Sequence, residues 1–396
     1  MSSTPVEPRG HRVAEYEEWV KEQRIPIHKG YFVSDFKTIE VGPWDQRGTN
    51  GCFVQLAGQE GWTQICVQEI PPGGTSKPFK MAIDELIFVA DGQGVTTLWA
   101  EGEKKITFEW NKFSLFLVPG NFWYQLSNMQ GTKPSRVVHY SYLPMAMETI
   151  RDREILFNCP VVDKSRIYHV KDFYSAAEVV TVDGVKKTNI WRGNFFPDTL
   201  AWDKLEDNTA MGVGRRLVWI RFPGSPMWAH IGQSDSFTYK KAHRHGPGTI
   251  VIFLSGEGYS LMYPEGKDKV ICPWHEGSAI VPPNNWFHHH FVQSPTTARM
   301  LALHRSRLQP GLGDNVVDYE RNEIQYWQED PSFRKMFEEK LAERGLSSQM
   351  PPECYRDKNF DPNWGRQGKT EGQKEKPYAC DFASRTSEYL KERRIT

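Results

Sequence analysis

The chain has 396 residues, of which 39% are hydrophobic and 13% aromatic, a length and composition that suit a folded protein with two substantial cores. Lys and Arg together number 49, as do Asp and Glu, so charge gives no reason to expect nucleic-acid or anionic-membrane partners. No apolar run approaches the roughly 20 residues of a membrane span, and the start of the chain lacks the apolar core of a signal peptide.

The cysteines are scattered along the chain and form no CxxC pair, so we expect free thiols in a cytoplasmic protein. They are Cys52, Cys66, Cys159, Cys272, Cys354 and Cys380.

The first third of the chain predicts a short helix followed by strands. Residues 11–24 have the spacing of an amphipathic helix, which belongs to an N-terminal segment spanning residues 1–51. Strand-like alternation then dominates, interrupted by turn signals such as the Pro-Pro-Gly-Gly at 71–74. These patterns predict a first β domain over residues 52–145.

The remainder of the chain predicts a connection, a second β domain and a tail. Residues 146–210 have mixed helical and extended character, and residues 211–306 again alternate like strands. From 307 to 396 the pattern changes to a charged helix, clearest over 330–344, and then to an extended stretch rich in Pro, Gly, Lys and Asn. We expect this tail to wrap over the surface or over a partner subunit of a homo-oligomer.

A split histidine pattern is the strongest indication of function. His243 and His245 are one residue apart, so on a β-strand their side chains share a face, and His288 can arrive from a later strand. Neutral imidazole suits iron, zinc, copper and nickel. Three protein ligands leave positions for exogenous ligands, as catalytic metal sites do. We therefore predict a catalytic transition-metal centre.

The same residues resemble the two motifs of the cupin family, G-x5-H-x-H-x3,4-E-x6-G and G-x5-P-x-G-x2-H-x3-N. The positions that agree are His243, His245, Gly256, Gly277, Pro283 and His288. Among the departures are Thr249 in place of the glutamate ligand, Asn285 in place of a glycine, and Val292 in place of the final asparagine. The missing glutamate narrows the resemblance to cupins whose metal is held by three histidines.

An internal repeat extends this resemblance to the first half of the chain. The segment 92–99 resembles 256–263, and the same shift of 164 residues carries Pro119 onto Pro283 and Tyr124 onto His288. One constant offset is what a tandem duplication leaves. The resemblance implies an all-β bicupin: two double-stranded β-helix (jelly-roll) barrels, with a short N-terminal helix and a helical and extended C-terminal tail.

The first copy lacks the metal ligands. The shift places Phe79, Met81 and Tyr124 at the three histidine positions, although Glu85 and Asn128 keep the family's glutamate and final asparagine. One carboxylate among such side chains would hold a divalent ion poorly. We predict a metal-free, structural first barrel and one metal centre in the second.

Other residues of the second copy are candidates for supporting roles. His290 should share the face of His288, and His304 lies on the last strand, so each is a candidate to line the site beside the ligands, with a core or surface role as the alternative. For substrate binding the candidates are Trp228 and two possible carboxylate anchors, Arg299 and Arg305.

Three neutral histidines would leave bound Fe(II) with its full charge, which favours an anionic substrate that chelates through two oxygens beside an open position for O2. His243-Arg244-His245 followed by a non-carboxylate also resembles the metal strand of gentisate- and salicylate-type ring-cleaving dioxygenases. By that resemblance the chain is a non-haem Fe(II) dioxygenase that cleaves a C–C bond of a hydroxylated aromatic acid or a β-dicarbonyl. In those enzymes the iron usually lies in the N-terminal cupin, whereas here only the C-terminal copy has the ligands.

Two other classes of function stay open. One is a non-oxidative metallo-cupin (a lyase, hydrolase or isomerase) in which the metal polarises a carbonyl or activates water, and which would work without oxygen. The other is a non-catalytic bicupin that binds a small molecule. The metal is open as well, because Mn, Ni, Zn and Cu also accept imidazole.

Overall fold

The computed structural model describes residues 14–163, 166, 174, 178–182, 188–203, 205–207, 211–305 and 322–360. Residues 11–13 of the predicted helix and residues 306–321 and 361–396 of the predicted tail lie outside this description. The chain divides into two compact units. Unit 1 is Met1–Val180, Trp191–Ala201 and Arg221–Ser225, and unit 2 is Thr181–Ile190, Trp202–Ile220 and Pro226–Thr396.

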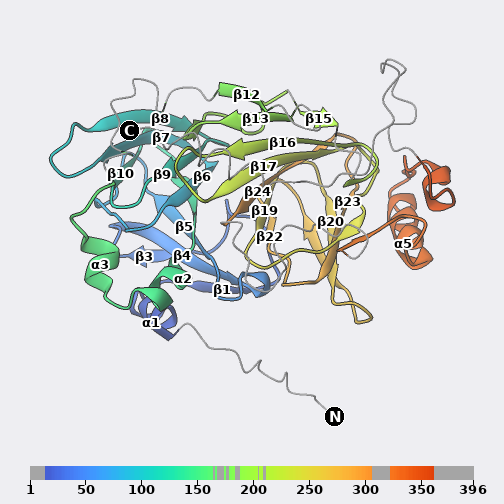
Figure 1. Ribbon diagram of the computed structural model, residues 1–396, viewed down its shortest axis with the longest axis horizontal. Coiled ribbons are helices and arrows are strands. Elements are labelled where there is room, and N and C mark those ends of the chain that lie inside the picture. Colours follow the sequence, from blue (N-terminus) through green and yellow to red (C-terminus); the bar gives the residue numbers. More distant parts are fainter. Residues whose placement is uncertain are drawn as a thin grey trace, which may run out of the picture. The chain divides into compact units, whose positions relative to one another are not determined.

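Unit 1 contains two β-sheets (Figure 1). Its strands are β1 (Ile27–Gly30), β2 (Phe32–Val33), β3 (Gly42–Trp44), β4 (Thr49–Leu56), β5 (Gln64–Ile70), β6 (Glu85–Asp91), β7 (Gln93–Trp99), β8 (Ile106–Asn111), β9 (Leu115–Val118), β10 (Trp123–Asn128), β11 (Ser135–Ser141) and β14 (Phe195–Phe196). One sheet has the order β1-β4-β5-β11-β6-β9-β14 and the other β10-β7-β8, with single bridges from Thr75 and Phe79 to β10. The strands from β8 to β11 alternate between the two sheets, an interleaved order that is typical of a jelly roll.

The strands after unit 1 repeat the arrangement. They are β12 (Glu178–Val182), β13 (Thr188–Arg192), β15 (Glu206–Asp207), β16 (Arg215–Arg221), β17 (Trp228–Ser234), β18 (Ala242–His243), β19 (Ile250–Ser255), β20 (Gly258–Tyr263), β21 (Val270–Trp274), β22 (Ala279–Ile280), β23 (Phe287–Val292), β24 (Ala298–His304) and β25 (Glu323–Ile324). One sheet includes the order β12-β13-β16-β17-β24-β19-β22, and the other is β21-β20-β23-β18-β25. Phe253 of β19 stacks on Trp274 of β21 at 4.2 Å, so side chains of the two sheets pack face to face. The predicted tandem jelly roll is confirmed.

The two barrels match strand for strand at the shift predicted from the sequence. Gly94 pairs with Asn128 in unit 1, and Gly258 pairs with Val292 in unit 2. Both glycines let a tryptophan pack onto the backbone. A Cβ at Gly258 would lie 2.6 Å from Trp274, and a Cβ at Gly94 would clash with Trp110 in the same way. The two barrels therefore share their strand register as well as their sequence motifs.

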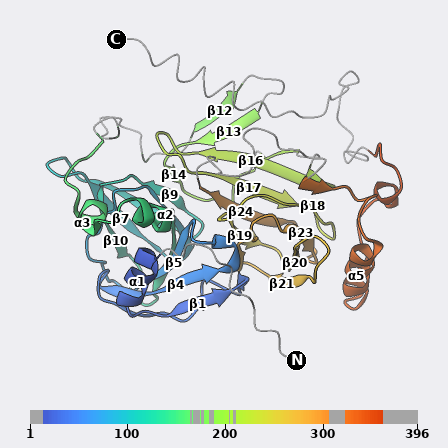
Figure 2. The same ribbon diagram turned by 60° about the horizontal axis from the view of Figure 1, so that its bottom comes forward.

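Short helices cover the barrels. In unit 1 they are α1 (Ala14–Glu22), α2 (Leu143–Thr149) and α3 (Arg153–Asn158), with the 3₁₀ turn η1 (Ala57–Gln59). In unit 2 they are α5 (Pro331–Ala342) and the 3₁₀ turn η4 (Pro352–Tyr355). Figures 1 and 2 show α5 beside β20 and β23, where Phe333, Phe337 and Leu341 enter the core of unit 2. None of the described helices is long and apolar enough to cross a membrane.

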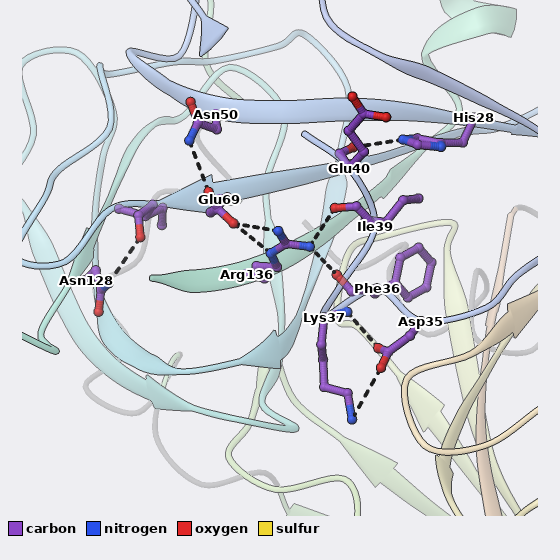
Figure 3. A network of polar contacts seen from close by, with 11 residues as sticks. His28, Asp35, Phe36, Lys37, Ile39, Glu40, Asn50, Glu69, Asn128 and Arg136 are labelled. Atoms are coloured by element: carbon purple, nitrogen blue, oxygen red, sulfur yellow. Dashed lines mark hydrogen bonds and ion pairs between the residues drawn. The ribbon is translucent and has the colours of Figure 1, made fainter. Parts of the chain in front are cut away.

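A polar network fastens the lead-in of unit 1 to its sheet (Figure 3). Arg136 of β11 forms a two-pronged ion pair with Glu69 of β5, at 2.6 and 2.8 Å. The same guanidinium donates to the carbonyl oxygens of Phe36 and Ile39 at 3.2 and 2.8 Å. The half-buried Arg136 side chain therefore connects two strands to the loop that contains Phe36 and Ile39. These charge-assisted hydrogen bonds stabilise the loop although it has no regular secondary structure.

Candidate metal centre

Three histidines meet in the second barrel. His243 ends β18 and pairs directly with His288 of β23, while His245 follows just beyond the end of β18. One nitrogen from each ring can be chosen so that all three lie within 4.8 Å of one another. Metal–nitrogen bonds of about 2.1 Å place two ligands about 3.4 Å apart in a tetrahedral site.

Backbone carbonyls orient two of the three rings. His245 Nδ1 lies 2.8 Å from the oxygen of Gly246, and His288 Nδ1 lies 3.3 Å from the oxygen of Trp286. A carbonyl can only accept a hydrogen bond, so each Nδ1 carries the proton and each Nε2 presents its lone pair. Metal-binding histidines are held by hydrogen bonds of this kind, so these two rings fit a metal ion.

Burial keeps the three rings neutral. It is the largest cause that lowers the pKa of His243 and His288 well below the usual value of 6.5, and it lowers the pKa of His245 to about 4. At neutral pH none of them carries a proton on both nitrogens. Their lone pairs are therefore available to a metal without the loss of a proton.

Lys240 is a functional candidate that the sequence reasoning missed. Its buried side-chain nitrogen lies 2.8 Å from His243 Nε2, close enough to donate a hydrogen bond to a lone pair on this ring nitrogen. A metal ion at the triad would compete with Lys240 for this lone pair. On a regular strand residues 240 and 243 face opposite sides, so their spacing gave no signal; an irregular stretch separates β18 from the Tyr239–Phe291 bridge.

Two buried guanidinium groups and one buried lysine lie near the triad. Arg215 and Arg305 are 4% and 7% exposed, and Lys240 is 6% exposed. Burial, then the charge of Arg215, lowers the pKa of Lys240 well below its usual range, while Glu323 opposes the shift. Glu323 itself is paired with Lys241 at 3.0 Å. Groups that bind this region favourably should therefore be anionic.

Two of the predicted supporting residues take part in hydrogen bonds beside the triad. His290 is buried next to it on β23, with Nδ1 2.7 Å from the hydroxyl of Ser260. His304 Nδ1 lies 3.1 Å from the hydroxyl of Thr249, the residue at the family's glutamate position. His304 Nε2 in turn lies 2.9 Å from Nδ1 of His230. These contacts link the last strand to the loop that follows the first two ligands.

The three residues predicted to bind substrate, Trp228, Arg299 and Arg305, have different neighbours in the structure. The ring of Trp228 stacks in parallel on His304, with ring centres 3.6 Å apart. Arg305 is buried and donates from Nε to the oxygen of Pro247, two residues beyond His245. Arg299 donates to the side-chain oxygen of Gln233 at 2.9 Å, on the strand position next to the buried Met300.

The corresponding place in the first barrel is filled by an arginine. Phe79 bridges Tyr124 as His243 pairs with His288. The Arg47 guanidinium carbon lies 3.3 Å from the centre of the Phe79 ring, and Arg47 donates to the Tyr124 hydroxyl at 2.5 Å. Tyr124 donates onward to Glu85 Oε2 at 2.5 Å. Glu85, which occupies the family's glutamate position, therefore lies in a hydrogen-bonded network that contains the Arg47 guanidinium.

That network continues through fully buried groups. The second oxygen of Glu85 lies 3.2 Å from His139 Nδ1, and His139 Nε2 lies 3.0 Å from the side-chain oxygen of Gln68. Burial raises the pKa of Glu85, but the interactions with His139, Arg47 and Tyr124 outweigh burial and hold this pKa below 4.5. Glu85 is therefore ionised and bonded to Tyr124 and His139.

Comparisons with known proteins leave the activity open. No protein-family model matches the chain, and a search of curated proteins finds no match. Vicilin from Corylus avellana (hazelnut) is 12% identical, covers 69% of this chain and 85% of its own, and has a TM-score of 0.43. A deletion mutant of oxalate decarboxylase from Bacillus subtilis is 11% identical over 70% of this chain and 77% of its own, with a TM-score of 0.45. Coconut allergen cocosin is 11% identical over 68% and 84%, at 0.43. Likenesses this remote carry no conclusion about function.

Proposed function

We propose that the second barrel holds one catalytic metal ion, bound by His243, His245 and His288. The observation that carries this proposal is the meeting of three neutral imidazoles, one buried and two half-buried, two of which have their Nδ1 protons fixed by backbone carbonyls. Fe(II) is the metal that we propose, with Mn, Ni, Zn and Cu as alternatives that imidazole also accepts.

We propose further that the chain is a dioxygenase that cleaves a C–C bond of a small, bidentate anionic substrate such as a hydroxylated aromatic acid. The metal would supply a Lewis acid and a template on which substrate and O2 meet. Lys240, Arg215 and Arg305 would draw the anion into the barrel, since none of the three triad ligands offsets the metal's charge. Trp228 and His304, already stacked, would offer a flat surface to an aromatic ring.

Only the second barrel would bind a metal ion. In the first, Arg47 and Glu85 both hydrogen-bond to the Tyr124 hydroxyl, and Phe79 and Tyr124 offer no imidazole. We therefore expect one metal per chain. The cytoplasmic location and the homo-oligomer remain predictions from the sequence.

Oxygen uptake tests the proposal. Protein loaded with Fe(II) under anaerobic conditions is offered a panel of hydroxylated aromatic acids and β-dicarbonyls, and oxygen consumption is then followed. We expect uptake with at least one anionic chelator, and none in the His288→Ala variant treated identically. Consumption of a substrate at an undiminished rate without oxygen would instead assign the centre to the lyase, hydrolase or isomerase class.

A further inference from the structure

A pocket lies at one end of the first barrel, away from the residues of the proposed metal centre in sequence and in unit. It has a volume of about 420 Å³, which is in the range of small-molecule sites. Helices α1 and α3 supply Trp19 and Phe157, and the barrel supplies Phe79, Lys80 and Trp123. Phe79 and Lys80 correspond to His243 and Arg244 under the internal repeat, so this pocket opens at the end of the barrel that bears the metal ligands in the second copy.

No carboxylate among the described residues pairs with one buried cation of this pocket. Lys80 is 6% exposed, and its ammonium donates to the carbonyl oxygen of Cys159 at 2.8 Å and lies 4.8 Å from the ring centre of Trp123. A carbonyl and an aromatic face solvate an ammonium but do not neutralise it. A buried charge without a counter-charge is costly, and an anionic ligand would remove that cost.

The acidic side chains of the pocket do not serve as this counter-charge. Glu22 pairs with Arg153 at 2.6 Å, and Glu154 is exposed to solvent, where it accepts from Asn158 at 2.9 Å. Among the described lining residues, Lys80 is therefore the buried charge that no side chain of opposite charge neutralises.

The rest of the lining combines aromatic rings with polar groups. Trp19 and Phe157 stack with ring centres 5.6 Å apart, and Phe157 also contacts Phe79 at 5.8 Å. Gln46, which lines the same pocket, has a buried side-chain oxygen without a hydrogen-bond partner among the described residues. That oxygen would accept a proton from a ring substituent of the ligand.

We propose that this pocket is a second ligand site, which takes a small aromatic carboxylate. Its acid group pairs with Lys80, its ring lies among Trp19, Phe79 and Phe157, and Gln46 accepts from a hydroxyl or amine on the ring. The first barrel thus has a binding role that does not depend on a metal.

Fluorine NMR of two matched probes tests this site. 4-Fluorobenzoate should bind at least tenfold more tightly than neutral 4-fluorobenzamide, and Lys80→Met should remove this preference while Lys80→Arg keeps part of it. Lys105→Met is the control, because Lys105 is an exposed lysine of the same barrel that also lies over a tryptophan. Gln46→Glu provides a second variant, since an added carboxylate should repel the benzoate.

Chelator-treated His288→Ala protein separates this site from the metal centre, and it should bind 4-fluorobenzoate as the unaltered chain does. The proposal is overturned if neither probe binds, if both bind equally well, or if Lys80→Met and Gln46→Glu leave benzoate binding intact. Binding that disappears in His288→Ala alone would place the ligand in the second barrel and also overturn it.

Discussion

Glu329 makes the stability of unit 2 depend on pH in a direction opposite to that of an ordinary carboxylate. It is 8% exposed; Tyr239 donates to one of its oxygens at 2.8 Å, and the other lies 4.0 Å from Nδ1 of the fully buried His289. Burial raises the pKa of Glu329 to about 8 and lowers that of His289 to about 3. At neutral pH both groups are therefore uncharged, and their contact is not an ion pair.

The sign and size of the effect follow from linkage. The folded chain keeps the Glu329 proton up to about pH 8, whereas an unfolded chain releases it near pH 4.5, so stability is full below 4.5 and falls as pH rises through 8. One pKa unit corresponds to about 1.4 kcal/mol, so this group costs unit 2 about 2 kcal/mol between pH 6 and pH 8. Glu329→Gln keeps an acceptor for Tyr239 and cannot ionise, so it should abolish this part of the pH dependence.

Urea unfolding at each pH, followed by a hydrogen-exchange pulse at one common pH, measures the unfolded fraction of the α5 peptide. This local readout is needed because a chain of two units need not unfold in one step. Glu339→Gln, at an exposed carboxylate of the same helix, is the control and should behave like the unaltered chain. A midpoint that does not fall from pH 6 to 8, or that falls equally in Glu329→Gln, would refute the reasoning.

Three further substitutions test the two barrels. Thr249→Glu places a carboxylate at the family's ligand position, so metal should be retained while oxygen uptake and substrate affinity fall, as read by metal analysis and an oxygen electrode. Lys240→Met removes the ammonium 2.8 Å from His243, so metal content should hold or rise while affinity for anionic substrates drops at least tenfold in titrations. Arg47→Met removes the guanidinium that donates to Tyr124 beside Glu85 and should cost unit 1 about 1–3 kcal/mol in denaturant unfolding.

The sequence predicted the fold well because the repeat fixes the register of both barrels. The similarity of segments 92–99 and 256–263 aligned Gly94 with Gly258, and the strand pairing around them follows the same shift. The pairing of His243 with His288 likewise follows from strand periodicity and motif spacing. Patterns of this kind depend on the spacing of residues along the chain, so they can be recognised in a single sequence.

What the sequence could not predict depends on long-range contacts between irregular segments. Arg47 reaches Tyr124 from a loop 77 residues away, and no spacing rule connects the two. Lys240 reaches His243 only because the strand is irregular there. Glu329 lies outside both motifs, and its burial against His289 is set by how the C-terminal helix packs.

Metal stoichiometry is the most direct test of the proposed centre. Protein purified without oxygen and reconstituted with Fe(II) should bind one ion per chain, and His288→Ala should lose most of it because two imidazoles hold a divalent ion poorly. Tyr124→Phe, at the equivalent position of the first barrel, should keep one ion. A ratio near two, or a His288→Ala protein that keeps its metal while Tyr124→Phe loses it, would contradict the assignment.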